Sequence, residues 1–285
     1  MRLSQLSDRP RAEARGRAGW RLWLLPTLFL LFLAGSLWLA LSASGSPSST
    51  TWDGRITEAV VAARTPGLSR LFWVFTILGD TPVMTVFISA TVILLLAWGK
   101  WTRAVLLAGA MASAQGLSSL SKTVFHRPRP PQIDMVIKEP GSYSFPSGHA
   151  FLSLVFIGLL VFLAFRWLSA HPRSPGSRAA SVGLRAVIVV AAAAVTTLVG
   201  LSRVYLGVHW TSDVLAGWCF GAAWLSVVLG VLLAWEKRGR SWSDSRPIPR
   251  TDARAALVVI LLLVTALVVF LAVRGDPLYL QLMPA

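Results

Sequence analysis

The chain has 285 residues, of which 55% are hydrophobic and only 14% are charged, and its mean hydropathy is +0.64. Soluble domains carry about a quarter charged residues, so this composition argues against a soluble protein and for a membrane protein. The net charge of +15 does not indicate nucleic-acid binding, because the basic residues are spread over the loops between apolar segments and nucleic-acid motifs are absent.

The N-terminal part combines a basic segment with an apolar one. Residues 1–21 hold six arginines in a polar, Ala- and Gly-rich context, and they are predicted to form a disordered cytoplasmic tail. Residues 22–42 are apolar and long enough to span a membrane. This run is longer than the usual ~7–15-residue core of a signal peptide. It is therefore predicted to be a retained anchor rather than a cleaved signal.

The next part of the chain is mixed before it becomes apolar again. Residues 43–70 contain Ser, Pro and Gly turns, a short amphipathic helix is predicted near 56–65, and residues 71–78 are expected at the membrane interface. The sequence Gly79-Asp80-Thr81-Pro82 predicts a break, with proline in the first turn of the second span. Asp80 is interpreted as a helix cap rather than as a catalyst.

Six more apolar segments follow the first, which makes seven predicted spans. Each is close to the ~20 residues that a bilayer requires; the six comprise residues 82–99, 103–122, 149–168, 184–202, 213–235 and 254–273. With the N-terminus inside, 18 of the 27 Lys and Arg residues lie in cytoplasmic segments. This distribution satisfies the positive-inside rule and predicts a cytoplasmic N-terminus and an extracytoplasmic C-terminus.

The connection between segments 184–202 and 213–235 carries unusual polar residues. Arg203, His209 and Asp213 are costly at membrane depth and usually functional when found there. His209 and Asp213 are four residues apart, so at the start of a helix they share one face and can form a hydrogen bond. A carboxylate on one imidazole nitrogen fixes the tautomer and leaves the other nitrogen to act as base or nucleophile.

Two earlier loops carry further candidate residues. Lys122 and Arg129 follow one apolar segment, and together with Arg203 they supply three cations that suit a phosphate group. A single basic residue at the end of a span is more often explained by its reaching the lipid headgroups. Ser147 and Gly148 precede a helix predicted to start near His149, where free N–H groups can bind an anion. An ordinary turn with a serine N-cap would have the same sequence pattern.

The three blocks read Lys-x6-Arg-Pro, Pro-Ser-Gly-His and Ser-Arg-x5-His-x3-Asp, in this order and without substitution. They resemble the signature of the type 2 phosphatidic acid phosphatase (PAP2) superfamily, over about residues 50–235. The resemblance implies an all-α, multi-pass transmembrane helix bundle with a six-helix core, followed here by a seventh C-terminal span. The expected organisation is the tail at 1–21, a PAP2-like membrane phosphatase domain at 22–235, and a cytoplasmic loop with the extra helix at 236–285.

The resemblance also implies roles for individual residues. His209 would attack phosphorus to form a phosphohistidine, and Asp213 would hold its other ring nitrogen. His149 would protonate the departing oxygen and then activate water. The substrate phosphate would be bound by Lys122, Arg129, Ser147, Gly148 and Arg203.

Neither a metal nor a cofactor is indicated. The sequence has no His-Glu-x-x-His motif, no cysteine pair and no acidic cluster of the kind that Mg²⁺ requires, so a metal-independent phosphatase is predicted. Tyr205, Trp210 and Trp218 are interpreted as an aromatic belt at the membrane interface. His126 and His171 are interpreted as surface residues, although His126 is close enough to Arg129 to touch a substrate.

The predicted function is hydrolysis of a lipid phosphate or diphosphate by a cell-membrane protein with an extracytoplasmic site. The predicted partners are the lipid substrate and membrane lipids, with no nucleic acid. Undecaprenyl diphosphate is placed first as substrate, followed by phosphatidylglycerol phosphate and phosphatidate. One alternative is a lipid phosphotransferase, which would use the same three blocks. A second is an anion transporter or channel, although the ionisable groups cluster at one surface. The soluble vanadium haloperoxidases of the superfamily are disfavoured by the seven spans.

Overall fold

The computed structural model describes residues 9–42, 51–131, 143–170 and 178–237, which form helices and connecting loops without β-strands. The all-α prediction is therefore confirmed for this part of the chain. The predicted span at 254–273 and the residue His171 lie outside the described residues. The helices are α1 (Arg9–Ser42), α2 (Trp52–Ala62), α3 (Pro66–Gly79), α4 (Thr81–Ala97), α5 (Trp101–Phe125), α6 (Gly148–Ala170), α7 (Arg178–Tyr205) and α8 (Thr211–Lys237).

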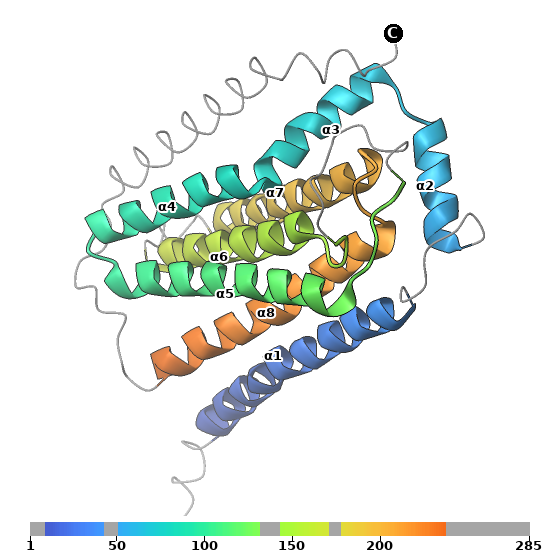
Figure 1. The fold of residues 1–285 in the computed structure, drawn as a ribbon. Helices are drawn as coiled ribbons and strands as arrows, with labels where there is room; N and C mark the ends of the chain where they lie inside the picture. Colours follow the sequence, from blue (N-terminus) through green and yellow to red (C-terminus); the bar gives the residue numbers. More distant parts are fainter. Residues whose placement is uncertain (1–8, 43–50, 132–142, 171–177, 238–285) are drawn as a thin grey trace, which may run out of the picture.

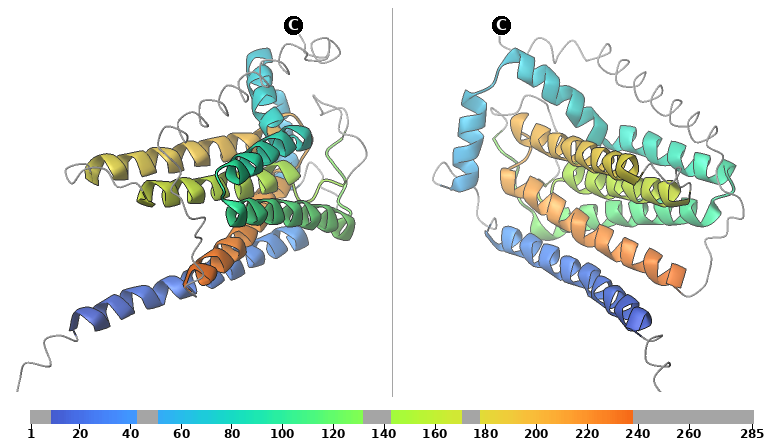
Figure 2. Two further views of the ribbon diagram at one scale, coloured as in Figure 1. Left: turned by 90° about the vertical axis from the view of Figure 1, so that its left-hand side faces the viewer. Right: turned by 180° about the vertical axis from the view of Figure 1, so that it is seen from behind.

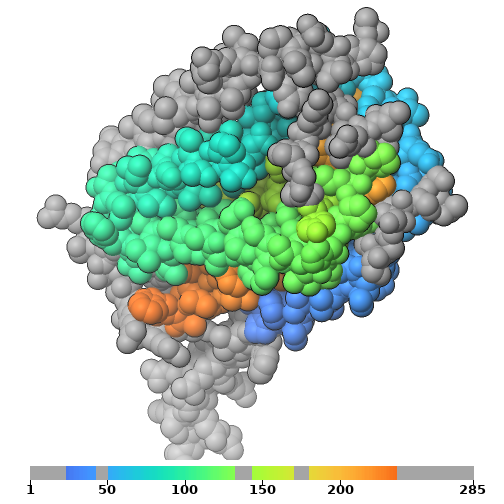
Figure 3. All heavy atoms as spheres, in the orientation of Figure 1, coloured from blue at the N-terminus to red at the C-terminus, as the bar shows by residue number. Residues whose placement is uncertain are grey.

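The long helices lie side by side, and α2 lies across one end of the bundle (Figures 1 and 2). Helix α6 is central and contacts α5, α7 and α8, while α1 packs along α8 at one edge. The space-filling view shows α4 and α5 lying against each other, with α8 and α1 along the lower edge (Figure 3). The main apolar core lies between α4, α5, α6 and α8, and its most buried members include Ala114, Phe151 and Val155.

Five of the described helices are long and apolar enough to cross a membrane: α5, α6, α7 and α8 in most of their length, and α1 from Leu24 to Ser42. Helices α3 and α4 form a sixth candidate as a pair bent by 50°. Multiple spans are therefore confirmed, at the positions of the first six predicted segments. The second of these starts earlier than predicted, because α3 is a regular helix rather than a mixed segment with an interfacial stretch.

Local sequence explains the start of α3 and the break that follows it. Thr65 caps α3, with its Oγ1 accepting from Leu68 N at 3.3 Å, and Pro66 occupies the first turn, where its missing N–H costs nothing. Asp80 then has extended backbone angles, and Pro82 starts α4 in the same way. The predicted break at 79–82 is confirmed.

Two further expectations about the N-terminal part are tested. Helix α1 begins at Arg9, so the prediction of a disordered tail is wrong for residues 9–21; their Ala, Arg and Glu residues are good helix formers. The amphipathic helix predicted near 56–65 is present as α2, a few residues earlier. Its start at Trp52 follows from Thr51, whose side chain accepts from Gly54 N at 3.2 Å.

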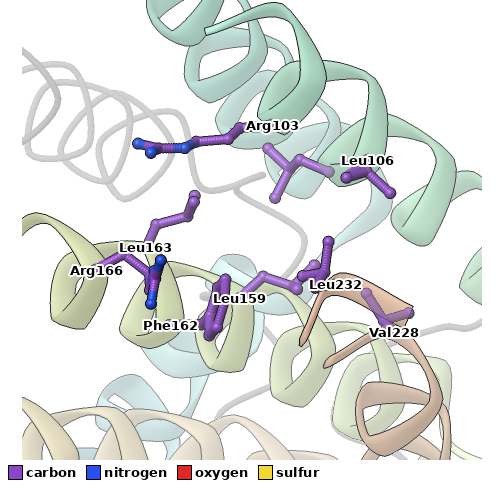
Figure 4. Close-up of a pocket in the computed structure, with 9 residues that line it drawn as sticks. Arg103, Leu106, Leu159, Phe162, Leu163, Arg166, Val228 and Leu232 are labelled. Carbon is purple, nitrogen blue, oxygen red and sulfur yellow. The ribbon is translucent and has the colours of Figure 1, made fainter. Parts of the chain in front are cut away.

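Two hollows in the bundle are mainly apolar. A small cavity of about 20 Å³ lies where α5 begins and α6 ends, and Arg103 and Arg166 line it together with apolar side chains (Figure 4). A larger groove of about 640 Å³ lies between α6, α7 and α8. Neither is lined by a predicted phosphate-binding residue. The residues of the three motif blocks lie at the other end of the bundle from the small cavity.

Candidate active site

The three motif blocks meet at one end of the bundle. Helix α5 ends there, α6 begins there, α7 ends there and α8 begins there, and α2 lies across the same end (Figure 1). The connection between α7 and α8 is short, from Leu206 to Trp210, and Ser144 N donates to the carbonyl of Arg127 at 2.8 Å between the two described parts of the connection from α5 to α6. The geometry therefore brings side chains from all three blocks together, as a single site requires.

His209 is buried, with 2% of its side chain exposed, and both of its ring nitrogens have partners. Nδ1 lies 3.3 Å from Asp213 Oδ2, and Nε2 lies 3.3 Å from Nη1 of Arg129. A guanidinium only donates hydrogen bonds and a carboxylate only accepts them. Assigned from these two partners, the imidazole carries its proton on Nδ1 and a lone pair on Nε2.

Asp213 is fully buried and is itself held firmly. Its Oδ2 also accepts from Trp210 N at 3.0 Å, and its Oδ1 accepts from Nη1 of Arg127 at 2.5 Å. The carbonyl of Asp213 accepts from Ser147 N at 3.0 Å, which ties the second motif block to the third. The carboxylate that orients His209 therefore has little freedom to move.

Arg127 and Asp53 were not identified from the sequence, and they complete this network. Arg127 Nη2 donates to Asp53 Oδ2 at 2.9 Å, while Asp53 also accepts from the backbone N of Ser212 at 3.0 Å and from its hydroxyl. The signal in the sequence was weak. Asp53 is one of only 12 acidic residues, and it lies on the side expected to be extracytoplasmic. An acidic residue on the same side as Arg127 was the one available indication that the two could pair.

The second motif block contributes a buried hydroxyl and a helix start. Ser147 is fully buried, and its Oγ makes no hydrogen bond to any of the described residues, so the hydroxyl does not cap α6. Helix α6 begins at Gly148, close to the predicted start. The approach of α8 requires Gly217, because a Cβ there would lie 2.6 Å from the carbonyl oxygen of Ser147. A buried hydroxyl beside a helix N-terminus suits a bound anion.

His149 contacts a residue that the sequence analysis assigned differently. Its Nε2 lies 2.7 Å from Oδ1 of Asp80. Asp80 occupies the N-cap position of α4, but its side chain makes no capping hydrogen bond. The interpretation of Asp80 as a helix cap is therefore wrong for its side chain. The reason is tertiary, because the packing of α6 against α3 delivers the imidazole to this carboxylate.

The three predicted cations have different surroundings. Arg129 contacts His209 and also donates to the carbonyl of Val208 at 2.7 Å. Arg203 is 1% exposed, and its Nη1 donates to Thr76 Oγ1 at 2.6 Å. Lys122 is half-buried, and its Nζ donates to the carbonyl of Tyr143 at 3.0 Å. Arg129 therefore directly faces the candidate nucleophile.

Two of the three aromatic residues interpreted as an interface belt are buried. Tyr205 stacks on Phe72 with ring centroids 4.5 Å apart, and its hydroxyl accepts from Thr65 N at 3.0 Å. Trp210 Nε1 donates to the carbonyl of Pro128 at 3.0 Å. The belt interpretation is wrong for both, because they pack the third motif block against its neighbours. His126 is exposed, as expected, and its ring lies edge-on to Tyr143.

Within the described ranges, no three His, Cys, Asp or Glu side chains are arranged to hold a metal ion. The charged groups that gather at the site are instead arginines paired with carboxylates and with a histidine. The guanidinium beside His209 and the buried hydroxyl of Ser147 are both groups that can bind the oxygens of a phosphoryl group.

Comparison with known proteins agrees with this chemistry. Residues 103–237 match the PAP2 superfamily. Phosphatidylglycerophosphatase B of Bacillus subtilis is 27% identical over 207 residues, which cover 72% of this chain and 92% of that protein. An undecaprenyl-diphosphatase of Sulfolobus acidocaldarius is 33% identical over 88 residues, which cover 31% of this chain and 32% of that protein.

A solved structure extends the likeness to the fold. The crystal structure of a transmembrane PAP2-type phosphatidylglycerolphosphate phosphatase from Bacillus subtilis superposes with a TM-score of 0.56 at 25% identity, and covers 74% of this chain and 96% of that one. Fold, site and relatives together define a multi-span membrane phosphatase. The PAP2 superfamily region spans residues 103–237, and the chain is similar over most of its length to membrane lipid phosphatases of this superfamily.

Proposed function

We propose that this protein hydrolyses a lipid phosphate or diphosphate by way of a phosphohistidine on His209. The observation that carries the proposal is the pair of contacts on that imidazole. Asp213 accepts from Nδ1, and a guanidinium faces Nε2. A histidine in this arrangement has a lone pair directed at a cation, which is where an anionic phosphoryl group would be bound.

The first chemical step is attack of Nε2 on phosphorus. Phosphoryl transfer depends on positioning and on charge stabilisation, which fixed cations and N–H groups supply. Arg129 would exchange its contact with Nε2 for phosphate oxygens, with the Ser147 hydroxyl and the N-terminus of α6 on the other side. Arg203 and Lys122 add charge to the site. The N–P bond forms as the bond from phosphorus to the lipid oxygen breaks.

The second histidine moves the protons. In the first step His149 would donate a proton to the departing lipid oxygen. In the second step it would take a proton from water as the water oxygen attacks the phosphohistidine. Inorganic phosphate leaves, His209 regains its lone pair on Nε2, and His149 is again protonated.

The lipid class follows from the surroundings of the site and from the relatives. The apolar groove between α6, α7 and α8 reaches Thr196 and Trp218, about one to two helical turns from Arg203 and Asp213. It would hold a hydrocarbon tail while the headgroup reaches His209. The relative that covers 72% of the chain is named a phosphatidylglycerophosphatase. Phosphatidylglycerol phosphate is therefore the first candidate and undecaprenyl diphosphate the second, which reverses the order expected from the sequence.

The test is competition between lipids. Purified protein in mixed micelles receives phosphatidylglycerol phosphate, undecaprenyl diphosphate and phosphatidate at equal surface fraction, and each product is resolved separately. Release of inorganic phosphate from at least one lipid is expected, and no release from any of the three would overturn the proposal. Repeating the assay with an added lipid alcohol tests the phosphotransferase alternative, which predicts a phosphorylated acceptor in place of free phosphate.

A further inference from the structure

The break between α3 and α4 lies against the second histidine of the site. At this break the chain turns by 50° between the two helices, and Asp80 has extended backbone angles. The Oδ1 atom of Asp80 lies 2.7 Å from Nε2 of His149, whose side chain is 14% exposed. We propose that Asp80 is a positioning residue that holds Nε2 of His149 and thereby assigns proton transfer to Nδ1. The inference rests on the function proposed above.

The backbone at the break is shaped to receive this imidazole. A Cβ at Gly79 would lie 2.7 Å from Cδ2 of His149 and 2.7 Å from Cγ1 of Val199. Real Cβ atoms do not approach neighbours so closely, so the ring packs directly on the glycine backbone. The ring plane is fixed by Gly79 and the direction of its Nε2 by Asp80. Two adjacent residues therefore determine the orientation of one side chain.

The same helical turn also holds a cation of the site. Thr76 is buried, and its Oγ1 accepts from Arg203 Nη1 at 2.6 Å. Thr76 lies in the last turn of α3, and Asp80 is the residue that directly follows the helix. The end of α3 therefore contacts residues of the second and third motif blocks, although it lies outside all three.

The chemical consequence concerns which nitrogen carries the mobile proton. A carboxylate only accepts hydrogen bonds, so the nitrogen that faces Asp80 carries a hydrogen in both protonation states of the imidazole. The proton gained and lost during the reaction must then be the one on Nδ1. In the first step the Nδ1–H bond breaks as the O–H bond of the departing alcohol forms. The carboxylate of Asp80 stabilises the imidazolium form through this hydrogen bond.

The decisive variant is Asp80→Asn. Its rates of phosphoenzyme formation and of phosphoenzyme hydrolysis are compared with those of the wild type. With a lipid alcohol as leaving group, turnover is expected to fall by about 10²-fold, the lower range for loss of general acid catalysis. With p-nitrophenyl phosphate, whose leaving group needs no proton, the burst of nitrophenolate is expected to stay within about threefold of wild type. Hydrolysis of the phosphoenzyme is expected to slow as it does with the lipid.

Two further variants serve as controls for the effect of Asp80→Asn. Asp80→Glu retains a carboxylate and is expected to recover part of the lipid activity, which a purely structural role of Asp80 would not require. Glu58→Gln removes the same charge from an exposed position of α2 and is expected to leave both substrates at wild-type rates. Thermal unfolding of each purified variant confirms that the compared proteins are folded.

The possible results separate this inference from the proposed function. If Asp80→Asn slows phosphoenzyme formation equally from both substrates, or slows it from neither, Asp80 does not position the acid and the inference is overturned. If Asp80→Asn does not fold, Asp80→Glu is the test. A folded Asp80→Glu protein whose rate of phosphoenzyme formation is reduced equally for the lipid and for the aryl substrate also overturns the inference. If the wild-type protein releases no phosphate from any lipid, the proposed function itself fails.

Discussion

Arg127 and Asp53 form an ion pair of 2.9 Å in which each side chain is only 4% exposed. The same guanidinium holds Asp213 at 2.5 Å, so α2 is tied by a buried charge to the carboxylate that orients His209. Removing one partner of a buried pair leaves an uncompensated charge, which costs about 3–5 kcal/mol. The ion pair therefore links the stability of the site to a helix outside the bundle.

Asp53→Ala is expected to lower the free energy of unfolding by about 3–5 kcal/mol and to reduce activity, because Arg127 loses its counter-charge. Thermal unfolding in detergent, with phosphate release measured on the same samples, tests this. Asp53→Asn should lose less, since an amide still accepts from Ser212. The exposed change Glu58→Gln is the control and should shift stability by no more than about 0.5 kcal/mol. Wild-type stability in Asp53→Ala would contradict the role of the pair.

His209→Ala is expected to abolish both turnover and the phosphoenzyme, because the nucleophile is absent. Asp213→Asn is expected to slow turnover by on the order of 10⁴-fold, as loss of the carboxylate that orients a catalytic histidine does elsewhere. Labelled substrate, quenched in alkali to preserve phosphohistidine, measures the intermediate. A labelled protein in the His209→Ala variant would place the phosphoryl group on another residue.

Activity is expected to persist in a chelator, because Lys122, Arg129 and Arg203 supply the positive charge. Vanadate is expected to inhibit, since its trigonal bipyramid resembles the transition state and transition-state analogues bind tightly. Phosphate release is measured with EDTA, with EDTA followed by Mg²⁺, and with increasing vanadate. Full loss of activity in EDTA that Mg²⁺ restores would refute metal-independent catalysis.

The active site is expected to face away from the cytoplasm. Reporter fusions in the loops 169–183 and 237–253 should both report a cytoplasmic location, as their Lys and Arg content predicts. A fusion after Tyr143, in the loop before α6, should report the opposite side. Either cytoplasmic loop found outside would reverse the orientation and place the motif blocks on the cytoplasmic face.

Filling the apolar groove is expected to affect long-chain substrates only. Ala193 lines the groove and is exposed, so Ala193→Trp should raise KM for a long-chain lipid phosphate severalfold and leave p-nitrophenyl phosphate unchanged. Ala194→Trp adds the same side chain to an exposed neighbour that does not line the groove. Equal effects of the two variants on the long-chain lipid would mean that the groove does not hold the tail.

Much of the fold was predictable because membrane helices depend on local sequence. A bilayer requires about 20 apolar residues per helix, and the first six predicted segments lie where helices are found. The break before α4 was predictable from Pro82, since proline lacks the N–H that would continue a helix. The start of α1 was not, because arginine and alanine suit a solvated helix as well as a disordered tail.

Of the contacts in the candidate site, one was predictable from the sequence and the others were not. The contact between His209 and Asp213 was predictable from their spacing of four residues, although His209 lies in the bend that precedes α8 and not on the helix itself. The partners of the other site residues depended on tertiary structure. Asp80 meets His149 across 69 positions, Asp53 meets Arg127 across 74, and Thr76 meets Arg203 across 127. Apolar periodicity indicates which face of a helix is buried, but only the packing of the helices decides which polar side chains meet at their ends.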